Sequence, residues 1–214
     1  MHSVVTPCPF HSWGLDIIGP INPTSSLRHK YIITATEYST KWVEAIPLRD
    51  NSGATIVAFI KEHIICRFGA PMIICSDNGT PFVNQTVIDL LDQYGIKFHT
   101  SIVYYSQWNG QAEATNKTLL RILSRMVYHH HRSWHEQLPL AIWAYRISKR
   151  SSTGASPYSL VYGEDAILPA EIAIPSARVA MDSLTTPDDV SRFAHLDTLE
   201  EWRAKVERFT DKYR

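Results

Sequence analysis

The sequence predicts an α/β protein in which a mixed five-stranded sheet is flanked by helices. Three apolar runs in the first quarter of the chain are rich in β-branched and aromatic residues and are joined by short connections, which favours antiparallel strands. Two more runs each follow a segment with helical spacing, an order typical of a mixed sheet. The expected strands cover residues 13–21, 30–36, 41–47, 71–77 and 95–100.

Four helices are predicted from apolar residues that recur every three or four positions. The first is stopped by Gly69 and Pro71, and the third begins after Asn109 and Gly110, because Asn-Gly favours a turn. The run His129–His131 precedes the last helix; since adjacent histidines point in different directions, a solvated loop is expected rather than a metal site. The expected helices cover residues 54–68, 84–94, 111–128 and 133–148.

The rest of the chain is predicted to extend this core. A segment rich in Pro, Ala and acids between Glu164 and Asp189 indicates an extended linker. Leu199, Trp202 and Val206 recur at helical spacing and predict an amphipathic helix that docks on the core or on another subunit. The expected organisation is a lead at residues 1–9, a core at 10–163, a linker at 164–195 and the amphipathic helix at 196–214.

The composition allows a sizeable core and gathers positive charge in one segment. Of the 214 residues 44% are apolar, and 21 Lys and Arg balance 21 Asp and Glu. Residues 114–150 nevertheless hold 7 basic and 1 acidic side chains, the local asymmetry that a polyanion needs. No apolar run approaches the ~20 residues of a membrane span, and no secretory signal follows Met1. We therefore expect a soluble protein with reduced thiols, in which Cys66 and Cys75 are core residues.

Three acids lie at positions that suggest more than a structural role. Asp16 is inside an apolar run, where a half-buried carboxylate needs a charged partner or a metal. Asp77 ends another apolar run, so it is expected at the tip of a strand. Glu113 falls in the first turn of the third predicted helix, where an acid can also serve only to complement the helix dipole. Taken together, three carboxylates without Cys or His ligands would suit a hard divalent cation.

The neighbours of these acids form a recognisable pattern. Asp77 lies in Ser-Asp-Asn-Gly-x-x-Phe, and 35 residues separate it from Glu113 in Gln-x-Asn-Gly-Gln-x-Glu-x-x-Asn. The chain thereby resembles the catalytic core of retroviral and long-terminal-repeat retrotransposon integrases. The phrases Gly-Leu-Asp-Ile-Ile-Gly-Pro, Tyr-Ser-Thr-Lys-Trp-Val-Glu-Ala and Ser-Pro-Tyr-Ser-Leu-Val-Tyr-Gly look most like the Ty3/gypsy class.

The resemblance implies a ribonuclease-H-like fold and a polynucleotidyl transferase that processes DNA 3′ ends and transfers them to target DNA. Asp16, Asp77 and Glu113 are then the catalytic and metal-binding residues, with Mg²⁺ or Mn²⁺ as cofactor. The implied partners are DNA and further copies of the chain, without a membrane or a small-molecule substrate, and the DNA substrate suggests a nuclear location. The expected DNA contacts are Asn78, Gln107, Asn109, Asn116, Lys117 and Arg121.

Departures from the family pattern leave other interpretations open. Ser106 replaces a usual proline, which is expected to loosen the loop before the third acid, and Glu37 replaces a more usual Asp on a turn. His2, Cys8 and His11 lack the spacing of the family's N-terminal zinc module, and its C-terminal DNA-binding module is not recognisable. The alternative hypothesis is an inactive or host-repurposed fragment that binds nucleic acid or protein. A nuclease acting on RNA–DNA hybrids is a weaker one.

Overall fold

The computed structural model describes residues 8–100, 106–151, 153–174, 176 and 198–206. Contacts within the chain divide it into two compact units, residues 1–146 and 147–214. The core boundary expected after residue 163 and the linker boundary expected after residue 195 remain predictions. In the part of the chain that the structure describes, no helix is both long and apolar enough to cross a membrane.

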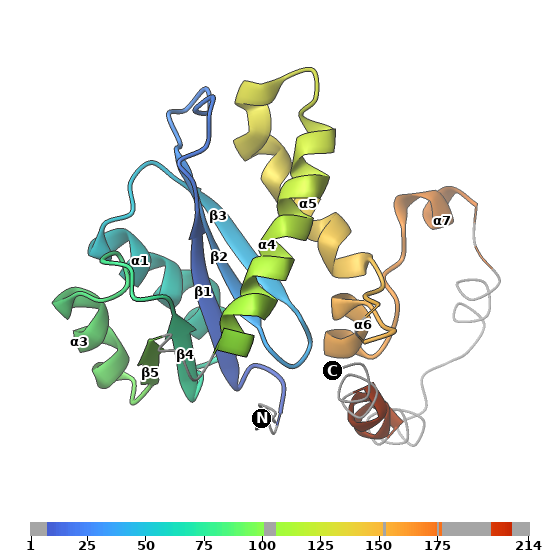
Figure 1. The fold of residues 1–214 in the computed structure, drawn as a ribbon. Coiled ribbons are helices and arrows are strands. Elements are labelled where there is room, and N and C mark those ends of the chain that lie inside the picture. Colours follow the sequence, from blue (N-terminus) through green and yellow to red (C-terminus); the bar gives the residue numbers. More distant parts are fainter. Residues whose placement is uncertain (1–7, 101–105, 152, 175, 177–197, 207–214) are drawn as a thin grey trace. The chain divides into compact units, whose positions relative to one another are not determined.

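The first unit is built on one mixed five-stranded sheet, which confirms the predicted fold class (Figure 1). The strand order is β3-β2-β1-β4-β5; β2 is antiparallel to β1 and β3, and β4 is parallel to β1 and β5. A short turn joins the antiparallel strands β2 and β3, and a helix over residues 85–93 joins the parallel strands β4 and β5. The strands are β1 (Ser12–Ile18), β2 (Tyr31–Glu37), β3 (Val43–Leu48), β4 (Ile73–Ser76) and β5 (Lys97–Thr100).

Helices cover both faces of this sheet, with α1 and α3 on one side and α4 on the other (Figure 1). The crossover helix predicted over 54–68 forms as α1, a π-helical segment η1 and the short α2. The side chain of Ser52 caps its beginning by accepting a hydrogen bond from the Thr55 amide. The bounds are α1 (Gly53–Phe59), η1 (Ile60–Ile65), α2 (Cys66–Phe68), α3 (Gln85–Gln93), α4 (Ser106–Met126), η3 (His131–Ser133) and α5 (Trp134–Ile147).

One apolar cluster holds α4 and α5 against the sheet. Leu119 and Leu123 of α4 and Leu138 of α5 pack with Ile32 and Val43 of the strands, and all five are buried. Each fully buried side chain of this size contributes about 1.5–3 kcal/mol. The cluster therefore fixes the α4 helix, which carries Glu113, over β1 and β2.

Four residues for which the apolar pattern predicts burial are exposed: Met126 of α4, Leu140 and Trp143 of α5, and Cys66. Leu140 and Trp143 of α5 are 51% and 38% exposed, although Leu138 and Ala141 of the same helix are buried as predicted. The reason is that the buried stripe follows the spacing from Leu138 through Ala141, which leaves the other apolar side chains on the outer side of the helix. Cys66 is also exposed, whereas Cys75 is buried.

Among its described residues, the second unit contains two short helices and a helical segment at residues 198–206. The first short helix ends at Gly163, whose φ of 88° suits a glycine cap. In the C-terminal segment, Trp202 and Val206 pack with Leu160, so the predicted amphipathic helix docks within its own unit. The two short helices are α6 (Pro157–Tyr162) and α7 (Pro169–Ala173), of which α7 lies within the expected linker.

Candidate active site

Asp16 lies in the central strand β1, opposite Thr34 of β2, and its side chain is neither fully buried nor fully exposed. Its Oδ1 accepts a hydrogen bond from the Ile17 amide at 2.7 Å, and its Oδ2 accepts one from Asn116 Nδ2 at 2.7 Å. A strand on which α4 packs thus presents a carboxylate directly to that helix. Both carboxylate oxygens are held in place before any ligand binds.

Burial is the main reason why the pKa of Asp16 is raised above its ordinary value. The negative charges of Asp77 and Glu113 raise the pKa further, while the two hydrogen bonds from Ile17 and Asn116 oppose the shift. Charges act on one another in this way only over short distances. The three acids selected from the sequence therefore share one electrostatic environment, although they come from three different elements.

Asp77 and Glu113 are the exposed members of this group. Asp77 directly follows β4, and its Oδ1 accepts a hydrogen bond from the Gly79 amide at 3.0 Å, which orders the Asn-Gly turn after the strand. Glu113 lies in α4 and pairs with Lys117 at 3.9 Å, a contact between two exposed side chains that contributes little to stability. Both carboxylates are therefore open to a ligand from solvent.

The donor chemistry around Asp16 fits a hard cation. Three carboxylates offer oxygen ligands of the kind that Mg²⁺ prefers, and Asn116 adds a buried amide oxygen, Oδ1, that has no hydrogen-bond partner among the described residues. Within the described residues, however, no three His, Cys, Asp or Glu side chains lie close enough to form a finished metal site. A bound cation would require the exposed carboxylates to turn toward Asp16.

The helix that carries Glu113 begins earlier than its sequence predicts. The structure starts α4 at Ser106, so Asn109 and Gly110 lie inside a helix of 21 residues instead of in a turn before it. Glu113 therefore lies in the third turn rather than the first, and the predicted helix-dipole contribution does not apply. The side chains of Gln107 and Asn109, both predicted DNA contacts, lie outside the described residues.

The other predicted DNA contacts divide into exposed and buried residues. Asn78, Lys117 and Arg121 are exposed, so their predicted role remains open. The side chain of Asn116 is turned inward onto Asp16, so the residue is only 5% exposed, and its predicted contact with DNA stays a prediction. The spacing of three residues between Glu113 and Asn116 predicted that both lie on one face of the helix. It could not predict that Asn116 binds Asp16, which lies on a strand 100 positions away.

Tyr38 and Gln111 form a contact that the sequence did not predict. Tyr38 is 6% exposed and accepts a hydrogen bond at its carbonyl oxygen from Gln111 Nε2 at 3.2 Å. In the sequence, only Gly14 could have indicated the position of Tyr38, because glycine inside a strand often marks a close approach of another group. A Cβ atom at Gly14 would lie 2.2 Å from the Tyr38 hydroxyl oxygen.

Comparison with known proteins relates part of the chain to a family. Residues 6–106 match the family described as Integrase core domain. The matched segment is therefore similar to an integrase core domain. The matched segment contains Asp16 and Asp77 and ends before Glu113. Glu113 therefore stays a prediction, which rests on its motif and on the effect of its charge on the pKa of Asp16.

Viral polyproteins contain segments that are similar to this chain. The chain is 30% identical over 179 residues to a Gag-Pol polyprotein of woolly monkey sarcoma virus, covering 83% of this chain and 10% of the polyprotein. It is 32% identical over 136 residues to a Pol polyprotein of feline endogenous virus ECE1, covering 63% of this chain and 13% of that one. The chain thus spans about a tenth of the length of these curated relatives.

A solved structure supports the same fold. A chain in the structure of the simian T-cell lymphotropic virus intasome in complex with a PP2A regulatory subunit matches with a TM-score of 0.65. The match covers 82% of this chain and 61% of that chain, at 19% sequence identity. At this identity the likeness concerns the fold, and it agrees with the order of strands and helices around the integrase core sheet.

Proposed function

We propose that this chain is the catalytic core of a Ty3/gypsy-type integrase that processes DNA 3′ ends and joins them to target DNA. The observation that carries the proposal is the environment of Asp16, whose carboxylate is held by Asn116 and feels the charges of Asp77 and Glu113. The integrase core match over residues 6–106 supports it independently. The three phrases typical of the gypsy class support the lineage.

Asp16, Asp77 and Glu113 would hold Mg²⁺ or Mn²⁺ between them, because carboxylate oxygens suit these ions. When bound, such ions help to activate the attacking oxygen of water or a 3′-hydroxyl group and reduce the charge on the leaving oxygen. Asn116 keeps Asp16 Oδ2 in one orientation through its hydrogen bond of 2.7 Å. The exposed positions of Asp77 and Glu113 leave one side of the site open to a DNA strand.

The basic face of α4 would bind the DNA backbone beside this site. Lys117, Arg121 and Arg125 recur every four residues, so they lie along one side of the helix, and all three are exposed. The Lys117 side chain is 77% exposed and is held only weakly by Glu113 at 3.9 Å, which leaves its ammonium group available to a phosphate. We further propose that the chain acts in the nucleus, as a multimer, on element ends and target DNA.

Disintegration, the reversal of strand transfer on a branched DNA substrate, tests the proposal with Mg²⁺ or Mn²⁺. Asp16→Asn, Asp77→Asn and Glu113→Gln should each abolish the reaction, while Glu62→Gln, which removes an exposed acid on η1, should retain it. Folding of every variant is checked by circular dichroism. Undiminished activity in any of the three acid variants would refute the assignment. Metal-independent DNA binding without cleavage by the wild-type chain would favour the repurposed fragment.

A further inference from the structure

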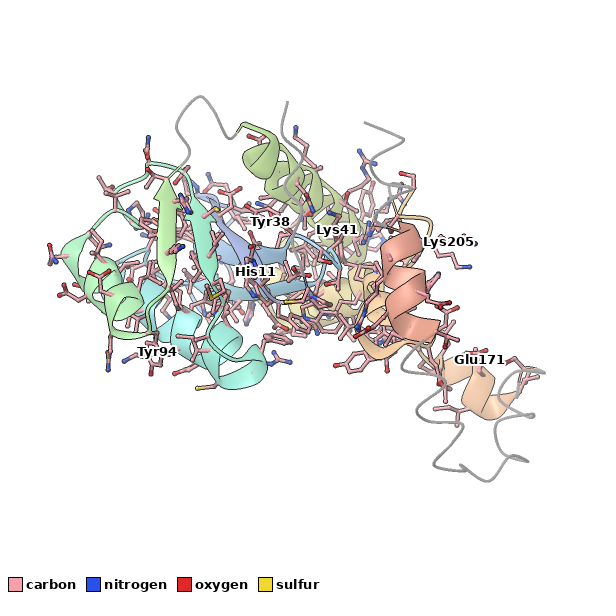
Figure 2. The ribbon with its side chains drawn as sticks, turned by 90° about the horizontal axis from the view of Figure 1, so that it is seen from below. His11, Tyr38, Lys41, Tyr94, Glu171 and Lys205 are labelled. Carbon is pink, nitrogen blue, oxygen red and sulfur yellow. The ribbon has the colours of Figure 1, made fainter. Side chains whose placement is uncertain are left out.

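Tyr38 is a buried residue with no part in the chemistry proposed above. It follows β2 directly, at the beginning of the turn that leads to β3. Its backbone carbonyl and its side-chain hydroxyl reach different elements of the first unit. Tyr38 and Lys41 lie near each other in Figure 2, and the Lys41 ammonium group donates a hydrogen bond to the Tyr38 carbonyl oxygen.

The carbonyl oxygen of Tyr38 connects the turn to α4. Gln111 Nε2 donates to it at 3.2 Å, across 73 positions of sequence. Because a carbonyl oxygen can only accept, the nitrogen of the Gln111 amide must face it. Gln111 lies two positions before Glu113, so this contact holds the part of α4 that carries the third acid.

The hydroxyl group of Tyr38 connects the turn to β1 and β4. Gly14 leaves room for it, since a Cβ atom at that position would lie 2.2 Å from the hydroxyl oxygen and 2.7 Å from Cζ. Burial raises the pKa of this hydroxyl, and Cys75 raises it further, which indicates that the thiol lies beside the hydroxyl. Gly14 and Cys75 are direct partners in the parallel pairing of β1 with β4. Gly14 precedes Asp16 by two positions, and Cys75 precedes Asp77 by two positions.

We propose that Tyr38 is a positioning residue for all three acids, because it contacts the residue two positions before each of them: Gly14, Cys75 and Gln111. This inference rests on the proposed function, because the positions of the three acids matter for activity only if they bind a metal ion together. Asp16 lies in β1, Asp77 directly follows β4, and Glu113 lies in α4. Long segments of the chain separate these three elements. A single buried residue that reaches all three elements through its carbonyl oxygen and its hydroxyl group fixes their relative positions, so that only the exposed carboxylates need to turn toward Asp16 when a cation binds.

Binding of Mn²⁺ alone to the full chain, measured by isothermal titration calorimetry, tests the inference without DNA. Tyr38→Phe removes the hydroxyl, and Gln111→Met removes the amide at nearly constant length. Each should weaken Mn²⁺ binding by about 10-fold, the lower end of the effect of residues that orient metal ligands. Tyr145→Phe is the matched control, because it removes another hydroxyl next to α4, which lies 3.3 Å from Thr115 Oγ1.

The path through Cys75 has its own test. Cys75→Ala should weaken Mn²⁺ binding as much as Tyr38→Phe, and the double variant should bind no more weakly than either single one, because both remove the same contact. Cys75→Ser keeps an acceptor for the hydroxyl and should restore most of the affinity. In the disintegration assay, Tyr38→Phe should lower kcat by about 10-fold and leave KM for DNA unchanged, since the residue acts through the acids.

Hydrogen exchange separates failure of this inference from failure of the proposed function. Amides of residues 111–114 should exchange faster in Gln111→Met than in wild type, and the control Gln85→Met on α3 should leave them unchanged. Unchanged exchange, or equal Mn²⁺ losses in Tyr38→Phe and Tyr145→Phe, would overturn the positioning role. Faster exchange in a chain whose wild type neither binds Mn²⁺ nor cleaves DNA would keep the structural contact and reject both the integrase and the positioning of a metal site.

Discussion

Glu44 on β3 is a buried carboxylate that joins three elements, and its replacement by Gln is expected to destabilise the protein strongly. Its side chain is 4% exposed. It accepts hydrogen bonds from Arg146 Nη2 at 2.6 Å, from Arg67 Nη1 at 2.8 Å and from Trp42 Nε1 at 2.8 Å. The Arg146 guanidinium group also donates to the Val43 carbonyl and lies 4.0 Å from the centre of the Trp42 ring.

The magnitude follows from the exposure of each partner. Removing one member of a buried ion pair costs about 3–5 kcal/mol, and the pair with Arg146 belongs to this class because the Arg146 side chain is only 17% exposed. The Arg67 side chain is 46% exposed, so solvent screens its pair and its loss adds at most about 1 kcal/mol. For a chain of this size, a loss of about 4 kcal/mol lowers Tm by roughly 8–16 °C.

Differential scanning calorimetry and urea denaturation measure this effect directly. Glu62→Gln removes an exposed acid and serves as the control, with an expected change below about 0.5 kcal/mol. The double variant Glu44→Met/Arg146→Met removes the charges together and should recover part of the lost stability. A loss smaller than about 1 kcal/mol in Glu44→Gln would show that water solvates the two arginines, and the argument from burial would be refuted.

Three further perturbations test other parts of the first unit. Gly14→Ala should cost about 1–3 kcal/mol, because its Cβ would lie 2.2 Å from the Tyr38 hydroxyl; an unchanged Tm would show that the ring moves freely. Glu37→Ala leaves three donors in the next turn without their acceptor and should cost about 2–4 kcal/mol in urea denaturation. Burial, aided by His135, lowers the pKa of His29, so the unfolded chain binds the proton more tightly. Stability should therefore fall as pH drops through about 6.5, and less steeply in His29→Asn.

The fold could be predicted because its determinants are local. Apolar runs mark all five strands, apolar residues that recur every three or four positions mark the helices between them, and short connections favour the antiparallel pairs. The exception is the beginning of α4. A glycine inside a helix costs only about 1 kcal/mol relative to alanine, and burial of Ala112, Thr115 and Asn116 in the following turns offsets that cost. Packing of the following turns therefore keeps Asn109 and Gly110 in the helix, although the two residues favour a turn.

The candidate site could be predicted only in part. Asp16, Asp77 and Glu113 were accessible to sequence reasoning, because an acid in an apolar run or at a strand tip is unusual in itself. Tyr38 carries no such signal, since a tyrosine in an apolar segment is an ordinary core residue. Its importance depends on Gln111, 73 positions away, and that proximity exists only in the folded chain.

The turn after β2 explains why Glu37 is compatible with a position where the resembled family more often has Asp. Its carboxylate accepts hydrogen bonds from the Ser39 amide at 2.9 Å, the Thr40 amide at 2.7 Å and the Thr40 hydroxyl at 2.6 Å. Burial raises the pKa of Glu37, and these three donors offset part of that cost. The residue that they hold in place is Tyr38, which stands between Glu37 and Ser39. A turn closed by a buried carboxylate thus gives Tyr38 a fixed backbone, and a fixed backbone is what its carbonyl needs to hold α4.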